Sequence, residues 1–237
     1  MIRRALTVFL GPAALAGGAA LGVWLWRRWG YAVETEDREV PTVPDPPVDA
    51  PAEPAGRPDV QDEDEGAGAR FHRRYQVDVA ESTHGPAELI GRIGADIQRY
   101  VPDEIATFEK VVGAPGQLDV GDEYHITIRS PWDGPVRVVE AEPTRFTLAT
   151  LEGHLEAGQI RFDARPLPDA PGALRFSIES WARSRDATVD FVYDELGLAK
   201  QAQQAMWTFF CERVAEDCGD HKLGEIRVLT ERDASDG

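Results

Sequence analysis

The chain has 237 residues, a formal net charge of −17 at pH 7 and a hydrophobic fraction of 42%. This length is sufficient for one folded domain with additional segments. Strong binding to nucleic acid is disfavoured, because an acidic chain without a compensating basic patch cannot neutralise phosphates.

An uncharged, apolar segment covers residues 5–26, and tryptophan, tyrosine and arginine residues follow it directly. As an α-helix this segment would extend about 33 Å at ~1.5 Å per residue, which matches the hydrocarbon thickness of a bilayer. Aromatic rings and cations are typical of the headgroup layer at the end of a membrane span. We therefore predict that residues 1–33 form a single-pass transmembrane anchor with its flanks, which would place the protein in the cell membrane.

Two features of this segment leave alternatives open. The tripeptide Ala14-Leu15-Ala16 has the small-x-small form of a cleavage site, so a cleaved signal peptide is the alternative to an anchor. Cleavage there would leave an apolar, tryptophan-bearing N-terminus, which favours the anchor. Each flank of the span carries two arginines, so the positive-inside rule does not assign the membrane side of the soluble part.

Residues 34–68 differ sharply in composition from the rest of the chain. They include seven prolines and twelve acidic residues against two arginines, with few large apolar side chains. Such a segment buries too little surface to offset the entropy of ordering. We predict a disordered, extended, acidic and proline-rich linker, in which the acidic run at 62–65 is a solvated stretch rather than a cation site.

Residues 69–220 have the length and patterning of one domain, and a polar tail is predicted at 221–237. Apolar residues alternate with polar ones where strands are expected and recur every three or four residues where helices are expected. The pattern predicts a strand at 71–79, a helix from 86 to about 97, a second short helix near 105–112, strands near 124–128, 136–141, 145–151, 159–164 and 173–182, and a long helix at 198–214.

The segment from Thr150 to Phe162 reads T-L-E-G-H-L-E-A-G-Q-I-R-F. It resembles the signature T-L-x-G-H-x-x-x-G-E-E-x-F of the domain of unknown function 1990 family, and a weaker resemblance extends over about residues 111–214. The segment 175–182, with Ser184 and Arg185 after it, is similar to the I-x-S-F-S-R/K-P segment of that family. Gln159 and Ile160 stand where the family has two glutamates, and the resemblance implies no proven activity.

The expected element order also resembles the helix-grip fold of the START, birch-pollen-allergen and polyketide-cyclase proteins. The resemblance implies an α+β domain in which a strongly curved antiparallel sheet wraps the long C-terminal helix, here preceded by one transmembrane helix. A sheet that bends around a helix without contacting it everywhere leaves an apolar pocket suited to one lipophilic ligand.

His154 is the best candidate for catalysis, because it can titrate near neutrality and lies between Glu152 and Glu156. The competing interpretation is structural. Side chains two apart on extended chain share a face, and the nearby Gly153 and Gly158 indicate a tight loop that a histidine could brace by hydrogen bonding. We favour the structural role and assign no catalytic residue.

His125, Glu179 and Trp181 are candidates for ligand binding, since polar and aromatic side chains on the strands could line the pocket. Alternation equally allows them to face water or to pack elsewhere. Cys211 and Cys218 are about 10.5 Å apart on a continuous helix at ~1.5 Å per residue, too far for a disulfide. With no second ligand cluster at zinc-site spacing, we predict free thiols, no metal site and no cofactor.

These observations predict a membrane-tethered domain that binds a hydrophobic small molecule or lipid, with no assigned catalysis. The alternative is a cyclase- or hydrolase-type enzyme that uses His154 with a nearby carboxylate. A third alternative is an interaction module with a packed interior. The position of His154 relative to the pocket separates the first two, and the packing under the helix bears on the third. The sequence does not indicate an oligomeric state.

Overall fold

The computed structural model describes residues 31–48, 59–61, 63, 66–128, 133–184 and 198–234. The transmembrane helix predicted at residues 5–26 lies outside these residues. Among the helices of the described ranges, none combines the length and the apolar character needed to cross a membrane.

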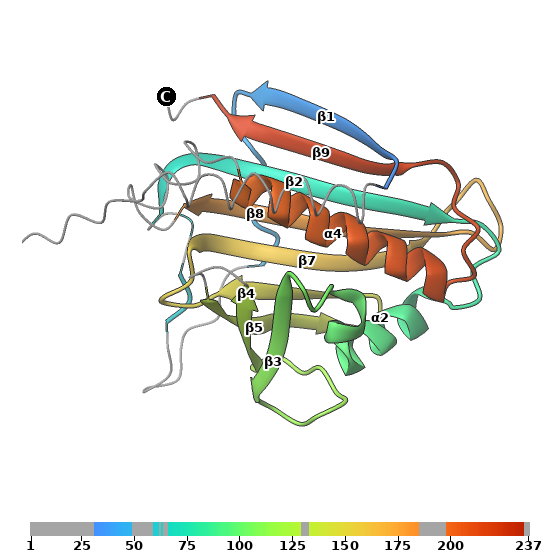
Figure 1. Cartoon of the computed structure of the whole chain (residues 1–237), viewed down its shortest axis with the longest axis horizontal. Helices are drawn as coiled ribbons and strands as arrows, with labels where there is room; N and C mark the ends of the chain where they lie inside the picture. Colours follow the sequence, from blue (N-terminus) through green and yellow to red (C-terminus); the bar gives the residue numbers. More distant parts are fainter. Residues whose placement is uncertain are drawn as a thin grey trace, which may run out of the picture.

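The described strands form one nine-stranded sheet that curves around a long helix (Figure 1). The strands are β1 (Val33–Val40), β2 (Ala67–Val79), β3 (Ala106–Val112), β4 (Glu123–Ile128), β5 (Asp133–Glu142), β6 (Arg145–Thr150), β7 (Glu156–Pro166), β8 (Leu174–Ser184) and β9 (Ile226–Asp233). The helices are α2 (Pro86–Ala95), the 3-10 helix η2 (Ile97–Tyr100) and α4 (Leu198–Asp217). The sheet order is β1-β9-β2-β8-β7-β6-β5-β4-β3.

The two faces of the sheet differ in chemistry, as the alternation in the sequence predicts. We call the face that packs against α4 the inner face and the opposite one the outer face. Inner-face side chains such as Val77, Phe162 and Ile178 are at most 1% exposed, whereas charged and polar side chains occupy the outer face. Because successive strand residues point to opposite faces, this partition fixes the register of each strand.

Aromatic rings pack the C-terminal half of α4 against the inner face. The ring of Phe210 lies 5.3 Å from that of Tyr100, 5.4 Å from that of Phe162 and 5.7 Å from that of Phe176, measured between centroids. Cys211 and Cys218 are buried on the same helix as free thiols, as predicted. Burial raises the pKa of the Cys211 thiol, so this cysteine is held in its unreactive protonated form.

The second short helix predicted at 105–112 is wrong, because this segment is strand β3. Ala106 and Phe108, two residues apart, share one face of this strand and face the core, and Phe108 pairs with Ile126 of β4. A short helical turn does occur earlier, as η2.

The sheet is larger than the sequence indicates and is mixed rather than wholly antiparallel. The sequence predicts that residue 33 belongs to the flank of the anchor, residues 34–40 to a linker and residues 226–233 to a tail. In the structure, residues 33–40 and 226–233 form β1 and β9, which pair in parallel. β9 continues the sheet beyond β2, with Ile226 and Val228 at 1% and 3% exposure. The charged β1 pairs mainly through its backbone, so composition alone gives no sign of it.

The described part of residues 41–63 also packs on the domain instead of forming a solvated spacer. Val43 is 2% exposed. The amide of Gln159 on β7 donates to the carbonyl oxygen of Val48 at 2.6 Å, and the Glu63 carboxylate accepts from Arg70 at 2.7 Å. This segment therefore belongs to the folded unit at each of these contacts.

Candidate functional site

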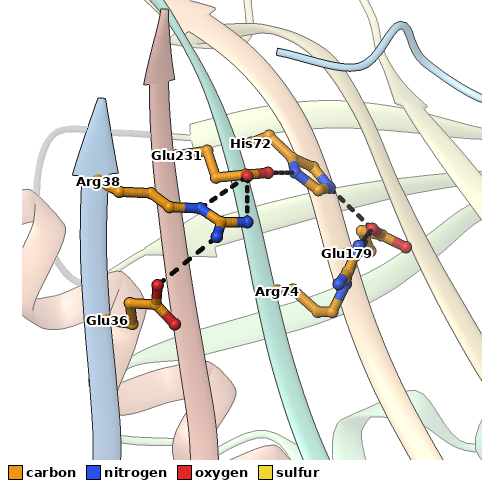
Figure 2. A network of polar contacts seen from close by, with 6 residues as sticks. All are labelled: Glu36, Arg38, His72, Arg74, Glu179 and Glu231. Carbon is orange, nitrogen blue, oxygen red and sulfur yellow. Dashed lines mark hydrogen bonds and ion pairs between the residues drawn. The ribbon is translucent and has the colours of Figure 1, made fainter. Parts of the chain in front are cut away.

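A buried histidine on the outer face lies between two carboxylates (Figure 2). His72 is 1% exposed, with Nδ1 at 2.6 Å from Glu231 and Nε2 at 2.7 Å from Glu179. Both ring nitrogens are therefore within hydrogen-bond distance of a carboxylate oxygen. Arg38 of β1 also donates a hydrogen bond to the carboxylate of Glu231, and Arg74 donates one to the carboxylate of Glu179. The network therefore ties β1, β9, β2 and β8 together.

The charges of this network balance one another. Burial raises the pKa of Glu179, but hydrogen bonds from His72 and Arg74 outweigh it and hold that pKa below its ordinary value. Burial also raises the pKa of Glu231, but hydrogen bonds with His72 and Arg38 outweigh burial, so the pKa is lowered. The arrangement is that of a satisfied structural ion network.

The three side chains predicted to bind ligand all lie on the outer face, away from α4. Glu179 is engaged with His72, and the Trp181 ring stacks on the His72 ring with centroids 5.2 Å apart. His125 is on β4, opposite Glu109 of β3, and its position in the alternation turns its side chain away from the core. These side chains therefore cannot line a space between the sheet and α4, because strand alternation turns them to the other side.

The glycines and threonine of the signature segment hold the β6–β7 hairpin in shape. The N–H of Gly158 donates to Thr150 Oγ1 at 3.0 Å. Gly158 has φ +149, and a Cβ atom there would lie 2.0 Å from the carbonyl oxygen of Trp181. Only glycine allows the backbones of β7 and β8 to approach this closely.

The geometry of His154 also fits a bracing role. The backbone N–H of Glu156 donates to Nδ1 of His154 at 3.0 Å, and the imidazole lies where a Cβ on Gly134 would be, 2.0 Å from its Cδ2. The carboxylate of Glu156 is turned toward α4, where it accepts a hydrogen bond from Gln203. The exposed Glu152 lies in the turn between the strands.

We expect His154→Asn to be tolerated and His154→Ala to lower the free energy of unfolding by about 1 to 2 kcal/mol. The amide oxygen of asparagine can replace Nδ1 as the acceptor for the Glu156 N–H, whereas alanine leaves that donor without its partner. Urea unfolding curves of the two variants measure the difference. Equal stability of both variants would contradict the bracing role.

A polar cluster lies on the inner face, beneath the N-terminal half of α4. The guanidinium of Arg73 on β2, a residue that is 6% exposed, donates to Oε1 of Gln203 on α4 at 3.2 Å. The amide of Gln203 donates to the carboxylate of Glu156 at 3.2 Å, and Arg73 lies 3.9 Å from that carboxylate. Ser180, the register partner of Arg73 on β8, is also on this face and is 6% exposed. We call Arg73, Glu156, Ser180 and Gln203 the inner-face cluster.

Trp207 extends this cluster by one helical turn. It follows Gln203 by four residues, so both side chains lie on the same face of α4. Trp207 is 5% exposed, and its indole N–H has no hydrogen-bond acceptor among the described residues. A buried donor without an acceptor costs about 1–3 kcal/mol, so a ligand atom that accepts this hydrogen bond would be favoured there.

Sequence reasoning found Glu156 but missed its partners. A usable signal was present in β2, where Arg73 stands in the same strand phase as Phe71, Tyr75 and Val77. A charged residue in the apolar phase of a strand is an exception that indicates a buried polar site. Gln203 carried no comparable signal. In the described ranges, no group of three or more His, Cys, Asp or Glu side chains is placed to hold a metal ion.

The topology fits the helix-grip class of α+β proteins. The order β2, α2, η2, six strands from β3 to β8 and then α4 agrees with the prediction except at residues 106–112, which form β3, and α4 packs on the inner face of the curved sheet (Figure 1). β1 and β9 are additions at the β2 edge.

Several solved structures are similar to the chain at low identity. A START superfamily protein from Mycobacterium smegmatis is 16% identical over 61% of this chain and 98% of its own, with a TM-score of 0.43. Norcoclaurine synthase from Thalictrum flavum, in complex with dopamine and hydroxybenzaldehyde, is 13% identical over 71% and 98%, with a TM-score of 0.44. A conserved protein from Geobacillus kaustophilus is 12% identical over 61% and 95%, with a TM-score of 0.42.

Likeness at this level carries no information about ligand or activity. No family model matches the chain, and no curated protein matches it. The similarity of residues 150–162 to the domain of unknown function 1990 signature therefore stays a resemblance.

Proposed function

We propose that this protein is a membrane-tethered domain that binds a hydrophobic small molecule or a lipid between α4 and the inner face of the sheet. The observation that carries the proposal is the buried indole N–H of Trp207, which lacks an acceptor among the described residues and lies one turn from the inner-face cluster. The polar head of the ligand would accept from Trp207, and its apolar part would pack among the surrounding rings.

The charges of the cluster narrow the chemistry of that head. Arg73 lies near the carboxylate of Glu156, so the positive charge is already balanced within the protein. A head with a neutral acceptor, such as a carbonyl or hydroxyl oxygen, therefore fits better than a doubly charged phosphate. The aromatic packing around Phe210 fills the C-terminal half of the space under α4, so the ligand would occupy the N-terminal half.

The apolar segment 5–26 supports the membrane tether. A binding domain held at a bilayer meets lipids at a high effective concentration, which suits a site for a hydrophobic ligand. The enzyme alternative has less support, because Nδ1 of His154 accepts from the Glu156 backbone while the Glu156 carboxylate faces Arg73 and Gln203.

The proposal predicts that Trp207→Phe lowers the fraction of protein carrying bound ligand by about tenfold at limiting ligand, the equivalent of one lost hydrogen bond. Phenylalanine keeps an aromatic ring but removes the N–H. Native mass spectrometry of the full chain, extracted from membranes in detergent, would measure the occupancy and the mass of the co-purified species.

Trp181→Phe is the matched control. Trp181 is also buried with an indole N–H that has no acceptor among the described residues, but it lies on the outer face. We expect the fraction of Trp181→Phe protein that carries bound ligand to equal that of the unmodified protein. An equal loss in both variants, or no bound species in any of the three proteins, would contradict a ligand site under α4.

A further inference from the structure

The first described residue after the apolar segment packs on the side of α4 that faces away from the sheet. The ring of Tyr31 lies 6.5 Å from the ring of Phe209 between centroids. Burial and the nearby carboxylates of Glu212 and Glu216 raise the pKa of Tyr31, which agrees with a position along the helix. The chain that leaves residues 5–26 therefore arrives directly at the outer surface of α4.

Only a few residues connect the apolar segment to the folded domain. β1 begins at Val33, two residues after Tyr31, and is held in the sheet by its pairing with β9. From Trp26 to Tyr31 the chain spans at most about 18 Å, since an extended residue covers ~3.3–3.6 Å. The headgroup layer beyond the hydrocarbon core is about 5–7 Å thick on each side. If residues 5–26 cross a bilayer, Tyr31 lies no more than about 18 Å from the end of the apolar segment, and the ring of Phe209 lies 6.5 Å from that of Tyr31, so this side of α4 stays near the membrane surface.

The surface around Phe209 carries both signs of charge. The guanidinium of Arg213 lies 5.7 Å from the centre of the Phe209 ring. Next to it is a hollow of about 460 Å³, lined by Phe209, by two arginines (Arg99 and Arg213) and by three acidic residues (Asp96, Asp103 and Glu104). Arginines suit a phosphate and carboxylates suit an ammonium group, so this surface is complementary to a zwitterionic headgroup.

We propose that the outer side of α4, around Phe209 and Arg213, lies against the headgroup layer of a zwitterionic phospholipid bilayer. In this orientation α4 separates the bilayer from the inner-face cluster. The proposal rests on the membrane anchor of the proposed function and replaces a domain on a long flexible tether with one fixed at the membrane surface.

Spin labels on single introduced cysteines test this orientation in the full chain, reconstituted in phosphatidylcholine nanodiscs that contain a nickel-chelating lipid. Glu216→Cys on α4 and Asp103→Cys at the hollow report on the proposed surface. Arg165→Cys on the outer face of the sheet and Val120→Cys before β4 are the controls, all four positions being exposed. The native Cys211 and Cys218 are buried and should not react under mild labelling.

We expect nickel at the headgroups to relax the labels at 216 and 103 several-fold more strongly than those at 165 and 120. Equal relaxation at all four positions in protein retained by the nanodiscs would overturn the orientation and leave the ligand site untouched. Protein recovered free of lipid would overturn the anchor and the orientation together, whereas ligand occupancy is measured separately. Stronger relaxation that occurs only when phosphatidylserine is added would overturn the zwitterionic partner.

Discussion

Replacing Phe210 by alanine should lower the free energy of unfolding by about 3 to 5 kcal/mol, the usual cost of removing a fully buried aromatic ring. Phe210 is 0% exposed, and three aromatic rings from η2, β7 and β8 surround it. These rings cannot all move inward to fill the space, because each is held by its own element. Most of the lost contact therefore remains as a cavity.

Phe209→Ala is the internal control for this change. Neighbouring residues on a helix point about 100° apart, and Phe209 is only partly buried, on the side of α4 where Tyr31 lies. We expect its cost to stay below about 1 kcal/mol. Denaturant unfolding of the two variants, followed by the near-ultraviolet signal of the aromatic core, gives the comparison. Similar losses in both would show that α4 is rotated relative to the structure described.

The central strands were predictable because apolar and polar residues alternate strongly along them, and α4 was predictable from large apolar side chains at three- and four-residue spacing, such as Met206, Phe210 and Val214, which are buried. Tyr124, Ile126 and Ile128 share one face of β4, as the alternation predicts, and they pack toward the core. β3 was missed for a physical reason. A segment of seven residues is too short for its apolar pattern to distinguish a helix from a strand, and pairing with β4 decides between them.

β1 could not be predicted from its own residues. Five of the eight residues in Val33–Val40 are charged, and the strand depends on backbone pairing with β9, almost 200 residues later. Hydrogen bonds to a distant strand leave no trace in local composition. The ion pair between Arg38 and Glu231, separated by 193 positions, is part of the same long-range contact.

The candidate site depends on similar long-range contacts. Arg73 and Gln203 are 130 positions apart in the sequence, and only the packing of α4 on β2 brings them together. Local reasoning paired Glu156 with His154 because they are two residues apart. In the structure His154 lies in the turn before β7, where Nδ1 accepts from the backbone N–H of Glu156, whereas the Glu156 carboxylate accepts from Gln203 on α4.

Asp217 at the C-terminal end of α4 should make the second large contribution to stability, and it should depend on pH. Its carboxylate accepts from Arg92 at 2.8 Å, from the Tyr100 hydroxyl at 2.8 Å and from Arg99 at 2.9 Å. The pKa of Asp217 is lowered from 3.8 to about 2, chiefly by the hydrogen bonds from Arg92. Burial acts in the opposite direction, whereas the Tyr100 hydroxyl and the charges of the two arginines lower the pKa further. The side chain is 7% exposed, although its arginine partners are partly in water.

We expect Asp217→Asn to lower the free energy of unfolding by roughly 1.5 to 2.5 kcal/mol at pH 7, at ~1.4 kcal/mol per pKa unit and allowing for solvent screening of the arginine partners. A carboxyl whose pKa is depressed in the folded state stabilises that state fully above its unfolded value. The contribution should therefore be present above pH 3.8 and disappear as the pH falls through about 2.

Glu216→Gln, at the neighbouring position, is the control for the charge change itself. Glu216 is 45% exposed and pairs only with Arg213 in the contacts described, so its removal should change stability by less than about 0.5 kcal/mol. Unfolding of the three proteins at a series of pH values from 7 down to 2 measures both effects. The difference between the unmodified protein and Asp217→Asn should narrow over the acidic end of that series while Glu216→Gln follows the unmodified protein throughout. A difference that is constant with pH would mean that Asp217 acts through packing rather than through its charge, because only the ionised carboxylate joins Arg92, Arg99 and Tyr100 to the end of α4.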